Sequence, residues 1–208
     1  MKKRRKFKGN IDNVLILSPE GCGSMFTYEI IQRHPELRYL KSSQWTPRGR
    51  HFRKRVAVKR GVIFHCSVPA GRRPTRWFNA SYMVHPRLYI LWIDRDRLHR
   101  IYSGYRRFRP RKMSKSQAIK QIIQFNDRAD NLIPRETAKC VDRGAKLFKT
   151  SYEKMVSDPK SYFAEIFKFI GCKNLDWFPP RAKVYNRNDQ RYLKDEVVVA
   201  EFIERGWI

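Results

Sequence analysis

Three short apolar runs constrain the fold of this chain more than any other feature of its sequence. Each run is long enough for a buried strand and too short for a buried helix, and they are Val14–Leu17, Val62–His65 and Leu88–Ile93. Helical patterns follow them, at about Ser24–Arg33 and over Leu98–Tyr105, where apolar residues recur every three or four positions. Apolar strands that alternate with amphipathic helices predict an α/β fold with a parallel β-sheet flanked by helices.

The rest of the chain extends this pattern. We expect a helix over about Ser114–Asn131, a weaker strand over Ala145–Lys149, and a helix that begins at Asp158-Pro159 and ends at Gly171. A short strand near Val56 is possible, and residues 69–86 are expected to form mainly loops. With 208 residues, the chain is expected to form a single domain over residues 11–208, after a basic, disordered tail at 1–10.

The formal net charge of +27 is the most unusual feature of the composition. A field of this strength attracts polyanions, so non-specific polyanion binding is expected. Nucleic acid, acidic polysaccharide, anionic lipid and a phosphorylated cofactor all qualify as the anion. The charge is clustered in three segments, at residues 1–8, 48–60 and 95–112.

The sequence also suggests where the protein acts. No apolar run is long enough to span a membrane, and the run at Val14–Leu17 is too short for the core of a signal peptide. We therefore expect a cytoplasmic protein. Its four cysteines lack the close paired spacing of a zinc site or a disulfide framework, so no metal is expected.

The most informative loops follow predicted strands. They are residues 19–24, 65–69 and 94–97, and they would line one crevice because the carboxyl ends of parallel strands share one edge of the sheet. In the first loop, the backbone N–H groups of Gly21, Cys22, Gly23 and Ser24 could converge on an anion at a helix N-terminus. The loop lacks the G-K-[ST] of a Walker A motif, and a simple tight turn is the alternative.

Two further segments resemble the sulfotransferase family. "LYILWIDRDRLHRIYSGYRRF" (Leu88–Phe108) resembles the family's 3′-phosphate-binding segment, in which an R-D-P-like turn precedes a helix with R-x-x-S-x-Y. "TSYEKMVSDPKSYFAEIFKFIGC" (Thr150–Cys172) is similar to the family's YE-x-L-x-x-D-P and I-x-x-F-L-G stretch. The first loop then takes the place of the 5′-phosphosulfate loop, P-[KR]-S-G-T-T. Pro19 matches, and either Gly23-Ser24 stands for the G-[ST] pair or Cys22 occupies the Gly position without a gap.

The resemblance implies a sulfotransferase with a P-loop-like, nucleotide-binding α/β fold. Such an enzyme moves a sulfuryl group from 3′-phosphoadenosine 5′-phosphosulfate (PAPS) to a hydroxyl or amine, without a metal. Arg95 and Ser103 would hold the 3′-phosphate, and the donor's other end would contact Gly21, Cys22, Gly23, Ser24, Met25 and Phe26. The basic residue of the loop is missing here, and Arg72 or Arg73 could supply its charge.

The acceptor also needs a base, and the resemblance offers two. His65 precedes Pro69 in "VIFHCSVP", where many family members carry a catalytic His, and Glu20 lies close to the phosphosulfate loop. The other histidines (His34, His51, His85, His99) are expected at the surface. Tyr152 fits either an adenine contact or a core position, and Arg181, Lys183 or Arg187 could add a phosphate contact.

Two other functions remain open at the level of sequence. Basic clusters interleaved with Trp45, Phe52, Trp77 and Phe108 would suit a nucleic-acid-binding protein, although no helix-turn-helix, zinc-finger or RNP signature is present. A family member that binds the nucleotide but is inactive would also fit. For an enzyme, the short, basic chain favours a large anionic acceptor such as a polysaccharide over a small phenol.

Overall fold

A parallel β-sheet forms the centre of the molecule. The computed structural model describes residues 13–38, 40–44, 61–68, 88–108, 113–180, 182–184 and 190–208. Five strands pair in the order β2-β3-β1-β4-β5, every pair parallel. They are β1 (Asn13–Pro19), β2 (Lys41–Gln44), β3 (Val62–Val68), β4 (Leu88–Asp94) and β5 (Lys146–Ser151).

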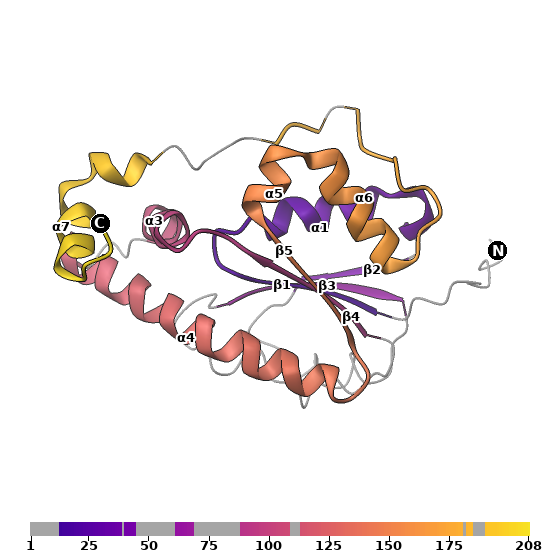
Figure 1. Cartoon of the computed structure of the whole chain (residues 1–208), viewed down its shortest axis with the longest axis horizontal. Helices are drawn as coiled ribbons and strands as arrows, with labels where there is room; N and C mark the ends of the chain where they lie inside the picture. The colour runs from indigo at the N-terminus through magenta and orange to yellow at the C-terminus, as the bar shows by residue number, and fades with distance from the viewer. Residues whose placement is uncertain are drawn as a thin grey trace.

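Helices cover both faces of this sheet (Figure 1). On one face lie α1 (Ser24–Arg33), α5 (Tyr152–Ser157) and α6 (Pro159–Ile170), while the long α4 (Lys115–Val141) crosses the other. Beyond the sheet, α3 (Arg97–Phe108) packs with the far end of α4 and with α7 (Glu196–Glu204). Two short 3₁₀ turns complete the described elements, at Pro35–Leu37 (η1) and Arg191–Lys194 (η4).

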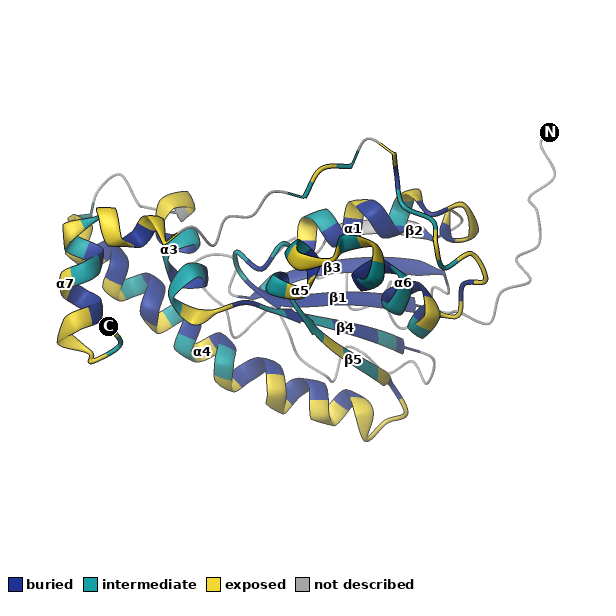
Figure 2. Ribbon diagram, turned by 45° about the horizontal axis from the view of Figure 1, so that its top comes forward, coloured by how far each residue is buried: buried dark blue, intermediate teal, exposed yellow. Residues whose placement is uncertain are grey.

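Side chains alternate between the two faces of the sheet along the central strands, so the core has two parts. Val14 and Ile16 of β1 pack in one cluster with residues of α1 and α6, whereas Leu15 and Leu17 pack with residues of α4. Successive side chains of a strand point to opposite faces, so a strand covered on both sides must be apolar throughout. Figure 2 shows the consequence, since β1 and β3 are almost entirely buried and β4 consists of buried and half-buried residues.

The predicted fold class is confirmed, and several elements match their predicted bounds. The helix at Ser24–Arg33 has those bounds, and α6 begins after an Asp158 side chain that accepts a hydrogen bond from the Ser161 N–H. Gly171 ends α6 in the left-handed conformation, with φ of 90°. These features follow from local rules of capping and periodicity, which the sequence displays directly.

Other bounds were wrong, and each error has a physical cause. Strand β1 extends past Leu17 to Pro19, and β3 extends past His65 to Val68. The polar side chains of Ser18 and Ser67 continue the side of each strand that faces α1, so the apolar runs underestimated both lengths. Helix α4 runs through Pro134 to Val141, since buried residues keep helical spacing on both sides of the proline. The elements β2, α5 and α7 were not predicted.

Some predictions concern residues outside the described ranges. These are the tail at 1–10, the strand near Val56 and the loops over residues 69–86. Among the described helices, none is long and apolar enough to cross a membrane. The thiols of Cys22, Cys66, Cys140 and Cys172 are buried and free.

Candidate functional site

The loop between β1 and α1 is built around two glycines in left-handed conformations. Gly21 has φ of 87° and Gly23 has φ of 75°, values that residues with a side chain rarely adopt. The Glu20 N–H donates a hydrogen bond to the Val68 carbonyl at 3.1 Å, which ties the loop to the end of β3. Helix α1 then begins at Ser24, so its first N–H groups lack partners within the helix and face the carboxyl edge of the sheet.

Neighbouring helices hold this loop from two sides. A Cβ atom on Gly21 would lie 3.0 Å from the Ser103 Cβ and 3.1 Å from its hydroxyl oxygen, so α3 packs directly against the loop. A Cβ atom on Gly23 would lie 2.7 Å from the Met155 Cε and 2.9 Å from a ring carbon of Tyr152. Both positions require glycine because of close approach as well as backbone conformation.

Arg95 joins the same loop from the end of β4. One guanidinium nitrogen donates to the Gly21 carbonyl at 2.8 Å, and the guanidinium carbon lies 4.2 Å from the centre of the Tyr152 ring. Arg95 is only 6% exposed, so it is not the surface ion-pair residue that a chance match to the motif would predict. Arg95 and Ser103, predicted as one phosphate site, therefore both contact Gly21.

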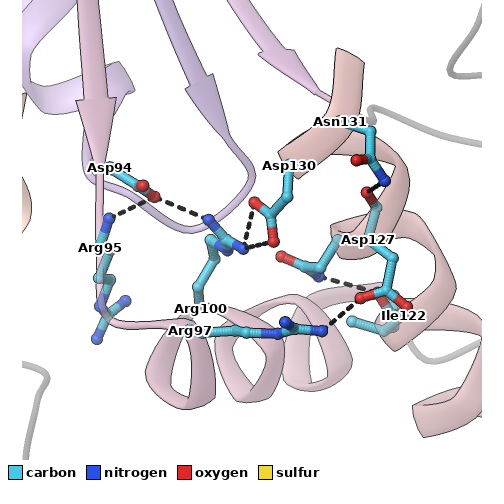
Figure 3. Close-up of polar contacts among 9 residues, drawn as sticks. Asp94, Arg95, Arg97, Arg100, Ile122, Asp127, Asp130 and Asn131 are labelled. Atoms are coloured by element: carbon cyan, nitrogen blue, oxygen red, sulfur yellow. Dashed lines mark hydrogen bonds and ion pairs between the residues drawn. The ribbon is translucent and has the colours of Figure 1, made fainter. Parts of the chain in front are cut away.

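Arg100 has a different role, shown in Figure 3. Its guanidinium lies between Asp94 at the end of β4 and Asp130 on α4, with nitrogen–oxygen distances of 2.6 to 2.8 Å. The side chain of Arg100 is 2% exposed, and these contacts join α3 to the sheet and to α4. Arg100 is therefore a structural residue that ties α3 to its neighbours.

A buried polar network lies beneath the first turn of α1. The Ser18 hydroxyl donates to the Ser24 oxygen at 2.7 Å, and the Ser24 oxygen lies 2.8 Å from Nε2 of His65. The Ser67 hydroxyl oxygen also lies 3.3 Å from Nε2 of His65. Since Ser18 donates to Ser24, the proton of Ser24 can be donated to Nε2, which requires the imidazole proton on Nδ1. The Ser24 side chain thus contacts His65, while its backbone belongs to the loop.

Burial alters the acid–base properties of both candidate bases. It lowers the pKa of His65 to about 4, so the imidazole is neutral at pH 7. Burial raises the pKa of Glu20 to about 7, against the opposing effect of the Arg107 guanidinium. Glu20 is half-buried at the start of the loop, whereas His65 lies at the middle of β3 (Val62–Val68).

The remaining predicted site residues are placed as follows. Cys22 is fully buried, Met25 is 41% exposed, and Phe26 packs edge-on against Phe163, so these residues can offer an anion at the loop only their backbone groups. Tyr152 is buried beneath Arg95. Lys183 is exposed, and Arg72, Arg73, Arg181 and Arg187 lie outside the described residues.

Among the histidines that the structure describes, His34 does not lie where the sequence predicted it. His34 is fully buried, not at the surface as expected. Its Nδ1 accepts a hydrogen bond from the Glu36 N–H, and its Nε2 lies 2.9 Å from the Asn174 carbonyl oxygen. It caps the η1 turn, a role that the following proline and glutamate could have indicated.

Sequence reasoning also missed Ser18, Ser67 and Arg107. The alternation Ile63-x-His65-x-Ser67 was a usable signal for Ser67, because residues two apart lie on one face of a strand. The described residues contain no group of histidine, cysteine and carboxylate side chains that could hold a metal ion.

The chain resembles known proteins in its three-dimensional structure. No family model matches the chain, and no curated protein matches it. A sulfotransferase from Alicyclobacillus acidocaldarius superposes with a TM-score of 0.50 at 15% identity, over 92% of this chain and 94% of that chain. Retinol dehydratase in a complex with retinol and PAP superposes with a TM-score of 0.48 at 12% identity, over 77% of this chain and 60% of that chain. The chain has a sulfotransferase-like fold.

Proposed function

We propose that the protein is a PAPS-dependent sulfotransferase. The observation that carries the proposal is the meeting of Arg95 and Ser103 at Gly21, the first glycine of the strand-to-helix loop. A guanidinium and a hydroxyl beside an anion-binding loop form a donor set for a second phosphate group. A nucleotide with charged groups at both its 3′ and 5′ positions matches this pair of neighbouring sites.

The residues of the chain fit such a donor. Backbone N–H groups at the start of α1 would bind the 5′ end, where the helix terminus favours negative charge. Arg95 and Ser103 would hold the 3′-phosphate, and Tyr152 fixes the Arg95 guanidinium by stacking beneath it. When bound, PAPS supplies the sulfuryl group that is transferred, and 3′-phosphoadenosine 5′-phosphate is the leaving group. Oriented N–H groups stabilise charge that develops on its oxygens without reorganising.

For the acceptor's proton, the geometry favours Glu20 over His65. A general base works best when its pKa lies near the working pH, and burial brings the pKa of Glu20 to about 7 but that of His65 to about 4. The Nε2 of His65 also lies within hydrogen-bonding distance of two serine hydroxyls. In the proposed mechanism, Glu20 removes the proton from the acceptor, and His65 positions the Ser24 hydroxyl.

The proposed acceptor is a hydroxyl or amine on an anionic carbohydrate. The support for this part is the charge of the chain, since a net +27 would concentrate an acidic polysaccharide near the site. The attraction should be screened by salt, because the Debye length falls from about 10 Å at 0.1 M to about 3 Å at 1 M.

The decisive experiment is a titration with 3′-phosphoadenosine 5′-phosphate, followed by thermal unfolding. A ligand that binds the native state raises its stability by RT ln(1 + [L]/Kd), so the midpoint should rise with concentration. Adenosine 5′-phosphate is the matched control and should have a smaller effect. Absence of any shift would contradict the proposal. A shift without sulfuryl transfer from PAPS to a panel of polysaccharides would indicate an inactive nucleotide-binding protein.

A further inference from the structure

The loop that would bind the 5′ end of the donor carries no cation of its own. Residues 19–26 contain neither Lys nor Arg, and their one ionisable carboxyl group belongs to Glu20. An anion bound at the loop would therefore stand beside a carboxylate. Two negative charges at short range repel each other strongly unless a cation lies near both.

Helix α3 brings a cation to this position. Ser103 packs against Gly21, and Arg107 lies four residues further along the same helix. Residues four apart in an α-helix occupy one face, with Cβ atoms about 5–6 Å apart. Arg107 is therefore on the face that covers the loop, one turn beyond Ser103.

The charge of Arg107 also affects the carboxyl group of the loop. The Arg107 guanidinium acts on Glu20, where it opposes the rise in pKa that burial causes. The Arg107 side chain is also exposed. The neighbouring Arg106 is exposed on the same turn of α3, but it does not contribute to the shift of Glu20.

We propose that Arg107 is the cation of the phosphosulfate site, supplied from α3 in place of a basic residue in the loop. This inference rests on the proposed function and deepens it. Arg107 would bind the charged 5′ group of the nucleotide and keep the Glu20 carboxylate compatible with that group. Arg95, just before α3, would then contact the 3′-phosphate of the ligand, and Arg107, in the last turn of α3, would contact its 5′ group.

The test compares Arg107→Ala with Arg106→Ala, which removes the same charge from the same turn. Affinities are measured by calorimetry for adenosine 3′,5′-bisphosphate and for adenosine 3′-phosphate, which lacks the 5′ group. Arg107→Ala should weaken the affinity for the bisphosphate by about 10- to 100-fold, which is the loss expected for a charged hydrogen bond. It should change the affinity for adenosine 3′-phosphate by less than about twofold. Arg106→Ala should affect both ligands equally and weakly, and Arg107→Lys should restore part of the loss.

A second readout needs no ligand. The carboxyl group of Glu20 is titrated by NMR in the free protein, and its pKa should rise in Arg107→Ala but not in Arg106→Ala. Equal effects of the two alanine variants on the bisphosphate would overturn the inference, as would equal losses for both ligands in Arg107→Ala. If the wild-type protein binds neither nucleotide, the proposed function itself fails. The inference fails alone if the wild type binds the bisphosphate and Arg107→Ala binds it equally well.

Discussion

The Nε2 atom of His65 lies 2.8 Å from the hydroxyl oxygen of Ser24, within hydrogen-bonding distance between the sheet and the first turn of α1. This contact links strand β3 to the loop that would bind the donor. It also engages the nitrogen that His65 would need to act as a base towards the acceptor. Substitutions at the two candidate bases and at the residues around them can separate these roles.

Glu20→Gln should reduce turnover far more than His65→Asn. Loss of a general base costs about 10²–10⁴ in rate. An asparagine at position 65 is too short to replace Nε2 and loses only a neutral hydrogen bond to Ser24, so His65→Asn should cost about tenfold or less. Donor affinity serves as the control and should change little in either variant. With Glu20 as base, the acidic limb of the kcat/KM profile should fall near pH 7 and not near pH 4. The reverse order of losses would make His65 the base.

The same two residues should have opposite effects on stability as pH changes. Between about pH 4 and 6.5 the unfolded state binds more protons at His65, whose folded pKa is depressed, so this residue makes the free energy of unfolding rise with pH. Between about pH 4.5 and 7 the folded state binds more protons at Glu20, whose folded pKa is raised, so this residue makes the free energy of unfolding fall with pH.

These opposing effects partly cancel in the wild type, and single variants should reveal them. Relative to wild type, Glu20→Gln should gain stability between pH 5 and pH 7, and His65→Asn should lose stability over the same interval. Urea unfolding at the two pH values measures both differences. A change of the same sign in the two variants would contradict the pKa shifts on which the prediction rests.

Arg95→Ala should selectively weaken ligands with a 3′-phosphate. The expected loss for adenosine 3′,5′-bisphosphate is about 2–3 kcal/mol, as for a hydrogen bond to a charged group. Adenosine 5′-phosphate should be affected much less, and this ligand controls for any disturbance of Gly21, which Arg95 also contacts. Equal losses for the two ligands, measured by calorimetry, would leave Arg95 with a structural role only.

Asp130→Asn should destabilise the protein more than Asp127→Asn. Asp130 pairs with Arg100, a side chain that is 2% exposed and would lose a charged partner in a buried setting, at a cost of about 2–3 kcal/mol. Asp127 pairs with Arg97 at the surface, where both side chains are more than two-fifths exposed, and such a pair contributes about 0–1 kcal/mol. Similar midpoints of urea unfolding for the two variants would show that the Arg100 ion pairs add little.

Gly23→Ala should cost more stability than Gly171→Ala. Both glycines have left-handed backbones, which cost a residue with a side chain about 1–2 kcal/mol. An added methyl group at Gly171 meets nothing within 4 Å, whereas at Gly23 it would clash with Met155 and Tyr152. Gly171→Ala therefore controls for backbone strain, and the difference between the variants in denaturant unfolding measures the close packing of the loop. Equal free energies of unfolding for the two variants would mean that the loop rearranges around the added methyl group with little loss of stability.

The sequence by itself determined the local framework of this protein. Apolar runs identified the strands β1, β3 and β4, and periodicity with capping residues located α1 and α6, because these signals depend on neighbours a few positions away. The order of strands and helices also predicted that the loops at residues 19–24 and 94–97 would share one edge, which the parallel pairing of β1 with β4 confirms.

Only the tertiary structure decided which side chains meet there and how they are charged. Ser24 and His65 are 41 positions apart, and Arg100 reaches Asp130 from another helix, so no local pattern announces either contact. The pKa values of Glu20 and His65 depend on burial, which is a property of the packed molecule. Helix α4 likewise continues through Pro134 because packing on both sides outweighs a local helix-breaking signal.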